Sequence, residues 1–218
     1  MQKIIYGGFL MKKLLVVLAS VVFATGLFAH EAGNTQLSIA GSVGLGFASG
    51  EAAFEAQSGV TVPYTVGIQA GYFLSDSIAI LFGVGYGAHP VMLVDKDDTD
   101  TGLKITQGFV DLSAGLRGYM SGLFLGAGFT YGIKTGDREM YAVVDGEETK
   151  MGDLLDKVCK NNASLYLEAG FAFPVSDDMT FDLGLKLNIG LVNSIEAEGL
   201  IELKAHSLDF TLGLSFLF

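Results

Sequence analysis

Apolar and polar residues alternate along eight stretches of the chain, each of eight to eleven residues. The stretches cover residues 37–47, 64–72, 78–87, 110–117, 123–132, 164–173, 181–191 and 208–218. A period of two places successive side chains on opposite faces of a β-strand. In the clearest stretch, Phe181, Leu183 and Leu185 alternate with Asp182 and Lys186. The sequence therefore predicts an all-β fold of eight strands.

The charged residues of these stretches all lie on one of the two faces. The apolar faces carry no Asp, Glu, Lys or Arg, whereas the opposite faces carry Asp111, Arg117, Glu168, Asp182, Lys186 and Asp209. Bulky apolar residues on one face and small polar residues on the other suit a transmembrane barrel, with lipid outside and a polar interior. The alternative is a soluble periplasmic or secreted β-sandwich, whose apolar faces would pack together. The mean hydropathy of +0.46 favours the barrel.

The connections between the predicted strands alternate in length. Short connections are expected at residues 74–77, 121–122 and 175–179, and long ones at about 49–60, 89–104, 133–162 and 193–205. Short turns on one side and long loops on the other are typical of outer-membrane barrels. In the last segment, Ile201 and Leu203 have the opposite parity to Leu208. This reversal predicts a bulge, or a later strand start, between them.

Composition narrows the remaining classes. The chain has 30 glycines, 3 prolines and one cysteine, Cys159. Few prolines leave long strands uninterrupted, and a single cysteine excludes an internal disulfide. After Ala29 no uncharged apolar stretch reaches the roughly 18 residues that a spanning helix needs. The net charge of −11 makes nucleic-acid binding an improbable function.

The beginning of the chain has the features of a secretory signal. Met11, Lys12 and Lys13 form a basic start, residues 14–28 form an uncharged apolar run, and small residues near Ala29 offer a cleavage point. We expect residues 1–29 to be a signal peptide with its natural start at Met11, and residues 30–218 to be the barrel domain. A retained membrane anchor is the alternative, although the run is short for one.

The last eight residues carry a further signature. They read Thr-Leu-Gly-Leu-Ser-Phe-Leu-Phe, an alternating aromatic strand that ends in Phe216 and Phe218. With the strand and loop rhythm, this segment resembles the small eight-stranded outer-membrane barrels of the OmpA-domain, OmpX and OmpW type. The resemblance implies the outer membrane of a diderm bacterium, contact with its lipid, and recognition of Phe216 and Phe218 by the outer-membrane assembly machinery. Tryptophan is absent, so the interfacial aromatic residues would be Tyr64, Tyr72, Tyr86, Tyr119 and Tyr131.

Candidate functional residues lie on the predicted inward face. Asp111, Arg117, Glu168, Asp182 and Lys186 are expected to line the interior, which in an eight-stranded barrel is just wide enough for side chains to fill. They would either pair as a structural plug or set the selectivity of a narrow pore. Many other inward positions are glycine, including Gly67 and Gly184. Glycine would either leave room for a solute or relieve crowding between closely packed strands.

The long connections are acidic. Asp95 to Asp100 hold four aspartates, which could bind calcium, although a solvated loop is the simpler interpretation. In the third connection, Leu154, Leu155 and Val158 predict a short amphipathic helix over residues 151–160. Cys159 is expected to be a loop thiol without a disulfide partner within the chain. No metal and no cofactor are expected.

Three function classes remain open. The resemblance favours a passive channel of the OmpW-like kind, for a small or hydrophobic solute. The competing class is a surface protein whose acidic loops bind a host or environmental ligand. Catalysis at the rim, near His89 or His206 and Ser207, is disfavoured because adjacent strand residues point to opposite faces. We expect no catalytic residues and no enzymatic activity.

Overall fold

The computed structural model describes residues 31–52, 56–97, 101–145, 147–151, 159–197 and 201–218. The expected signal peptide, residues 1–29, lies outside the described residues. In the part of the chain that the structure describes, no helix is long and apolar enough to cross a membrane.

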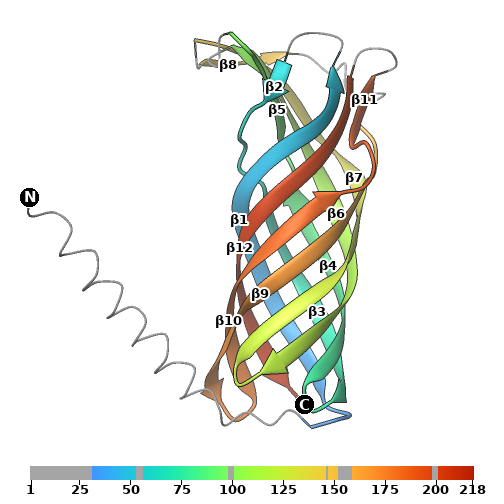
Figure 1. Ribbon diagram of the computed structural model, residues 1–218, viewed down its shortest axis with the longest axis vertical. Coiled ribbons are helices and arrows are strands. Elements are labelled where there is room, and N and C mark those ends of the chain that lie inside the picture. The colour runs from blue at the N-terminus through green and yellow to red at the C-terminus, as the bar shows by residue number, and fades with distance from the viewer. Residues whose placement is uncertain (1–30, 53–55, 98–100, 146, 152–158, 198–200) are drawn as a thin grey trace, which may run out of the picture.

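Eight long strands form a closed antiparallel barrel (Figure 1). Each pairs with its neighbour in sequence, and the first pairs with the last. The eight-stranded all-β fold predicted from the alternation is therefore confirmed. The strands are β1 (Thr35–Ala52), β3 (Tyr64–Ser75), β4 (Ile78–Ala88), β6 (Gly102–Met120), β7 (Leu123–Val144), β9 (Asn162–Ser176), β10 (Met179–Gly190) and β12 (Ile201–Leu217).

Four short strands lengthen one end of the barrel, at the top of Figure 1. They are β2 (Ala56–Ser58), β5 (Val91–Asp95), β8 (Glu147–Met151) and β11 (Ile195–Ala197). We call this the extended end, and the opposite one the short-turn end. Much of the sequence expected to form long loops is therefore strand, because β6 and β7 also continue to Gly102 and Val144. Pairing continues here because it satisfies backbone groups whether or not the side chains are apolar.

The connections at the short-turn end match the prediction. Residues 76–77, 121–122 and 177–178 join β3 to β4, β6 to β7 and β9 to β10. Ser121 and Gly122 have φ angles of 50° and 81°. Two positive φ angles are typical of the tight type I′ turn, whose twist matches that of paired strands.

The last strand corrects one expectation. Its register with β1 runs without a shift from Ile201 opposite Ala52 to Leu217 opposite Gln36, so the predicted bulge or later start is wrong. Leu203 and Asp209 share the inward face, and both are buried. The parity of the strand is constant along its length. What changes is the chemistry of the interior, which is apolar near the extended end and polar further down.

Tyr119 corrects a second expectation. Tyr64, Tyr72, Tyr86 and Tyr131 lie on the outer face, at least one-third exposed. Tyr119 instead shares the inward face of β6 with Arg117, two residues away. Its ring packs against the rings of Phe73 and Phe124, with centroids 5.5 Å and 6.3 Å away. It therefore belongs to the interior and not to the interfacial aromatic residues.

Inward glycines allow close strand contact at some positions and not at others. A Cβ atom on Gly67 would lie 2.5 Å from the carbonyl oxygen of Val84 and 2.7 Å from the Cα of Gly85. On Gly213, which also faces the interior, the nearest atom would be the Cβ of Asp182 at 3.5 Å. At Gly67 the glycine therefore relieves crowding.

These two glycines give a matched pair for mutation. We expect Gly67→Ala to lower the free energy of unfolding by about 1–3 kcal/mol, because the added methyl group meets backbone. Gly213→Ala should change it by less than about 1 kcal/mol. Urea titration of the refolded protein, followed by the heat-modifiable band on gels, measures both. Equal losses in the two variants would contradict the crowding interpretation.

Candidate functional site

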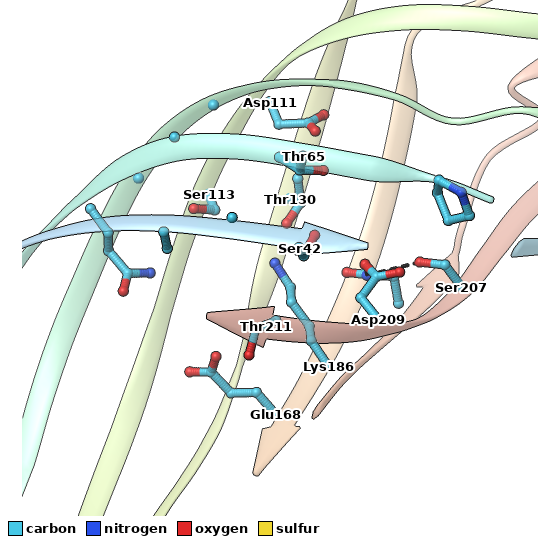
Figure 2. A pocket seen from close by; sticks show the side chains of 18 of the residues that line it. Ser42, Thr65, Asp111, Ser113, Thr130, Glu168, Lys186, Ser207, Asp209 and Thr211 are labelled. Carbon is cyan, nitrogen blue, oxygen red and sulfur yellow. Dashed lines mark hydrogen bonds between the residues drawn. The ribbon is translucent and has the colours of Figure 1, made fainter. Parts of the chain in front are cut away.

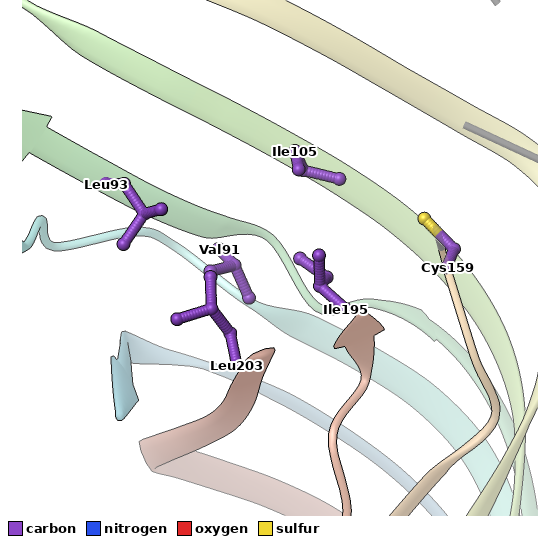
Figure 3. Close-up of a cluster of buried hydrophobic side chains, with 6 residues drawn as sticks. All are labelled: Val91, Leu93, Ile105, Cys159, Ile195 and Leu203. Atoms are coloured by element: carbon purple, nitrogen blue, oxygen red, sulfur yellow. The ribbon is translucent and has the colours of Figure 1, made fainter. Parts of the chain in front are cut away.

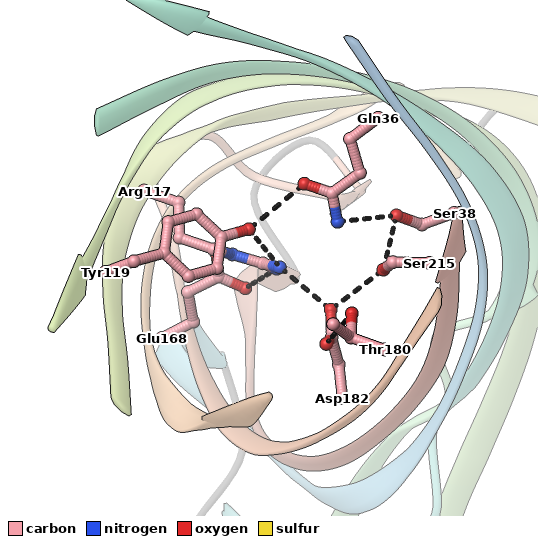
Figure 4. Close-up of polar contacts among 8 residues, drawn as sticks. All are labelled: Gln36, Ser38, Arg117, Tyr119, Glu168, Thr180, Asp182 and Ser215. Atoms are coloured by element: carbon pink, nitrogen blue, oxygen red, sulfur yellow. Dashed lines mark hydrogen bonds and ion pairs between the residues drawn. The ribbon is translucent and has the colours of Figure 1, made fainter. Parts of the chain in front are cut away.

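The barrel interior is filled by side chains at three levels. A ring of hydrogen-bonded polar groups, which we call the polar ring, crosses it toward the short-turn end (Figure 4). A polar cavity lies above this ring, and an apolar cluster fills the mouth at the extended end. The polar ring consists of Gln36, Ser38, Arg117, Tyr119, Glu168, Thr180, Asp182 and Ser215.

Arg117 is the centre of the polar ring. Its Nε and Nη2 atoms donate to the two carboxylate oxygens of Glu168, at 2.8 Å and 3.0 Å. Its Nη1 lies 3.3 Å from Oδ2 of Asp182. The guanidinium also stacks over the ring of Phe124, with 4.3 Å from Cζ to the centroid. A planar fork is suited to this two-point contact with a carboxylate.

Hydrogen bonds continue from Arg117 around the barrel wall. The Tyr119 hydroxyl donates to Oε1 of Gln36 at 3.1 Å, and Nε2 of Gln36 donates to the Ser38 hydroxyl at 3.1 Å. Ser38 and Ser215 hydroxyls are 2.8 Å apart, and Ser215 donates to Oδ2 of Asp182 at 3.0 Å. The circuit joins β1, β6, β10 and β12, so it ties opposite sides of the wall together.

Apolar side chains pack between the polar ring and the short-turn end. Phe73, Ala79 and Leu81 are at most 1% exposed, and Tyr119 and Leu217 pack against them. This group and the polar ring together fill the barrel interior toward the short-turn end.

Above the polar ring lies a cavity of about 150 Å³ (Figure 2). Lys186 extends into it from β10, with Nζ 4.3 Å from the centre of the Tyr166 ring. The strand register places Lys186 opposite Glu168 on β9 and Asp209 on β12. A volume of this size, lined by hydroxyl and charged groups, has room for several water molecules.

Two carboxylates at the upper wall of the cavity each keep one oxygen without a protein partner. Oδ2 of Asp111 lies 3.0 Å from Nε2 of His89, and Oδ2 of Asp209 accepts from Nδ2 of Asn188 at 2.8 Å. Oδ1 of each residue is buried, with no hydrogen-bond partner within the described protein. Because a buried acceptor of this kind is costly when unsatisfied, we expect water to occupy the cavity beside them.

An apolar cluster, which we call the mouth cluster, lies at the extended end of the barrel interior (Figure 3). Every member is at most 6% exposed, and Cys159 is fully buried. The cluster is built partly by β5 and β11, which lie outside the eight barrel strands. Its members are Val91, Leu93, Ile105, Cys159, Ile195 and Leu203.

Cys159 lies in the connection between β8 and β9, as expected from the sequence, and its side chain is buried in the mouth cluster. Its backbone forms an isolated β-bridge with Ile195, which draws it into the mouth. Of the helix expected over 151–160, Met151 is the last residue of β8, and residues 152–158 lie outside the described residues. Asp97, in the acidic stretch, donates its backbone N–H to Oδ1 of Asp95 at 2.8 Å, as in an Asx turn.

The structure places all five candidate interior residues against the cavity or the polar ring. It brings Arg117, Glu168 and Asp182 into direct contact, whereas Asp111 contacts His89 and Lys186 contacts Tyr166. Sequence reasoning missed Tyr119, Gln36 and Tyr166 as partners. Their positions in the alternating pattern place them on the inward face, and this pattern could have identified them.

A serine and a histidine meet on the outer wall near the extended end. The Ser49 hydroxyl lies 2.7 Å from Nε2 of His206, and the backbone N–H of Gly190 donates to Nδ1 of His206 at 3.2 Å. If Nδ1 accepts, a neutral imidazole carries its proton on Nε2, which then donates to Ser49. A general base would have to accept the serine proton, so this pair lacks the arrangement for activating a nucleophile.

The extended end carries ion pairs on its surface. Glu139 accepts from Nζ of Lys150 at 2.7 Å and from the Tyr141 hydroxyl at 2.6 Å. These two hydrogen bonds lower the pKa of Glu139, and the bond to Glu139 raises the pKa of Tyr141. Because the pKa of Glu139 is lowered on folding, its contribution to stability is present near neutral pH and is lost as the pH falls through that pKa.

Comparison with solved structures agrees with this architecture. Outer membrane protein OprG of Pseudomonas aeruginosa has a TM-score of 0.50 and 13% identity, over 87% of this chain and 98% of OprG. Outer membrane protein W of E. coli has a TM-score of 0.48 and 16% identity, over 87% of this chain and all of that one. The Ail protein of Yersinia pestis, bound to the heparin analogue sucrose octasulfate, has a TM-score of 0.44 and 11% identity, over 86% of this chain and 99% of Ail. At this identity the likeness to OprG shows the fold.

No curated protein sequence is a significant match to the chain. The sequence profile described as the outer membrane protein beta-barrel domain matches residues 15–216, nearly the whole chain. Together with the closed barrel and its apolar outer face, this match places the protein in the outer membrane, with lipid around it. The chain belongs to the outer membrane protein beta-barrel domain family.

Proposed function

We propose that this barrel does not conduct and that it acts through its extended end, which faces the cell exterior and binds a ligand of the host or environment. The observation that supports this is the packing of the interior at both ends. The polar ring with its apolar neighbours fills the interior at one end, and the mouth cluster fills it at the other. An open pore needs a continuous water-filled path, which side chains packed at both ends would interrupt.

The exposed surface of the extended end supports a recognition role. Strands β2, β5, β8 and β11 continue the barrel wall and place acidic residues such as Asp95, Glu147 and Glu148 on a rigid support. Loops and strand ends on a rigid scaffold commonly carry binding residues. The excess of carboxylates favours a cationic ligand.

A narrow channel is the second candidate, and the cavity around Lys186 is the observation that favours it. Its polar lining and its volume of about 150 Å³ suit a small solute if both closures move. In that case Lys186 would set ion selectivity, together with Asp111 and Asp209. The passage of a small or hydrophobic solute belongs to this candidate.

Planar-bilayer recording of the refolded protein tests both candidates. We expect no discrete conductance from the wild type, with folding and insertion established by the heat-modifiable band and by protease resistance. Discrete openings whose ion selectivity changes in Lys186→Ala would overturn the closed barrel and support the channel. Transplanting the four outer segments onto an unrelated small barrel should transfer ligand binding if the recognition role holds.

Targeting and assembly complete the proposal. Residues 1–29 would direct export and be removed, and Phe216 and Phe218 would be recognised by the outer-membrane assembly machinery. The backbone N–H of Phe218 donates to the carbonyl of Thr35 at 2.9 Å, so the last residue takes part in closing the barrel. Replacing Phe218 would therefore test assembly and closure together.

A further inference from the structure

The outer wall carries a groove of about 640 Å³ at the extended end, which we call the rim groove. It runs over the segment that precedes β9, the segment that follows β10, and the start of β12. All of its lining residues lie in the described part of the chain. They include Tyr131, Lys160, Asn161, Leu191, Val192 and Lys204.

The rim groove lies where the apolar outer face ends. Tyr131, Leu191 and Val192 are exposed on the outer wall, and Leu191 and Val192 directly follow the last residue of β10. Lys160 and Lys204 border the same groove. An aromatic hydroxyl and lysines beside exposed apolar residues are the usual chemistry of a membrane–water interface.

Hydrogen bonds within the groove leave the Tyr131 hydroxyl able to donate. Nδ2 of Asn161 donates to the Tyr131 hydroxyl at 2.9 Å, and Oδ1 of Asn161 accepts the backbone N–H of Lys134 at 3.1 Å. Asn161 is thus fixed in one orientation. Because the tyrosine oxygen already accepts a hydrogen bond, its proton remains available for an acceptor in the groove.

The two lysines are held on neighbouring segments. The backbone N–H of Lys160 donates to the carbonyl of Ser194 at 2.8 Å, and that of Ser194 donates to the carbonyl of Leu203 at 2.8 Å. Lys160 and Lys204 therefore flank one intervening segment, with backbones about 10 Å apart at ordinary strand spacing. Two lysine side chains can converge on one anion across this distance.

Neither lysine forms an ion pair with another described residue. Two other lysines at the extended end are paired with carboxylates: Lys104 with Glu148 at 2.6 Å, and Lys150 with Glu139 at 2.7 Å. Among the described residues, no carboxylate lies within ion-pair distance of Lys160 or Lys204. The nearby carboxylate of Glu202 accepts from Nδ2 of Asn193 at 3.2 Å. In a chain of net charge −11, two neighbouring lysines without a carboxylate partner among the described residues give the groove a locally cationic border.

We propose that the rim groove binds the phosphate group of a membrane lipid. Lys160, Lys204 and the Tyr131 hydroxyl supply hydrogen-bond donors for the phosphate oxygens. Leu191 and Val192 contact the first part of the acyl chains. The groove thus combines charge complementarity with an apolar floor at the height where lipid headgroups lie.

Native mass spectrometry of the folded protein in detergent, titrated with phosphatidic acid, tests this proposal. We expect the variant Lys160→Gln/Lys204→Gln to bind phosphatidic acid about 30-fold more weakly than the wild type. The matched control Lys104→Gln/Lys150→Gln removes the same charge from the same end and should bind as the wild type does. Dioleoylglycerol, which has the acyl chains without phosphate, should bind weakly to all three proteins.

Several outcomes would overturn the proposal. One is the absence of phosphatidic acid binding to the wild type, and another is equal weakening in the two double variants, which would mean general electrostatic attraction. If inorganic phosphate competes at the same concentration as the lipid, the groove is a site for free anions and not for a headgroup. The heat-modifiable band of each variant establishes that it has folded, and all four substituted lysines lie outside the buried interior.

Discussion

Replacing Arg117 with alanine is expected to lower the free energy of unfolding by about 3–5 kcal/mol, because it leaves a buried carboxylate without its partner. Glu168 accepts hydrogen bonds from two Arg117 nitrogen atoms, at 2.8 Å and 3.0 Å, and both are lost in this variant. Asp182 is less affected, since Ser215 and Thr180 still donate to it, at 3.0 Å and 3.1 Å. Most of the cost should therefore arise at Glu168.

A second variant separates two effects of removing Arg117: the unpaired charge left on Glu168 and the lost packing against Phe124. In Arg117→Met/Glu168→Gln a neutral amide replaces the carboxylate, and methionine restores part of the apolar contact with Phe124. We expect this variant to recover more than half of the lost stability, as read from urea midpoints of the heat-modifiable band. The exposed pair gives the control: Lys150→Ala should cost less than about 1 kcal/mol. An Arg117→Ala midpoint equal to that of the wild type would show that the polar ring contributes no net stability.

The second large effect is expected in the mouth cluster. Leu203 is 2% exposed and packs with Leu93 and Ile195, so Leu203→Ala should lower the stability of the mouth by about 2–5 kcal/mol. The fully buried Cys159 thiol of the same cluster reports on the change. We expect a maleimide to label the wild type slowly and the variant many times faster.

Leu212→Ala provides the matched control on the same strand. Leu212 faces lipid, which can fill the space left by the side chain, so labelling of Cys159 should stay at the wild-type rate. Rapid labelling of the wild type would mean that the mouth opens readily in solution. That result would favour the channel among the proposed functions.

The barrel could be predicted from the sequence because one rule governs each membrane-spanning stretch. Lipid excludes charge from the outer face, so Phe181, Leu183 and Leu185 had to alternate with the inward Asp182 and Lys186. No such rule applies beyond the membrane. The ends of β6 and β7, and the short strands that continue the wall, depend on backbone pairing that leaves no regular pattern in the side chains.

The sequence predicted which charged residues face the barrel interior, but it did not predict which of them contact one another. Parity placed Arg117, Glu168 and Lys186 on the inward face. Which charged side chains form contacts depends on the strand register and on the tilt of the strands around the barrel. Neither quantity can be predicted from the local sequence. The bulge predicted near Leu203 was wrong for a related reason. Its prediction assumed a polar interior throughout, whereas the interior becomes apolar toward the extended end.

The pairing of β1 with β12 has a consequence for the order of events during synthesis. Thr35 and Phe218 exchange backbone hydrogen bonds at 3.0 Å and 2.9 Å, although almost the whole barrel sequence separates them. Strand β1 therefore cannot complete its pairing until β12 has been synthesised. Until then each of the two strands has an unpaired edge that can pair with other chains. Closure is a single late event, so the nascent chain has to be kept from aggregating for as long as its final strand takes to arrive.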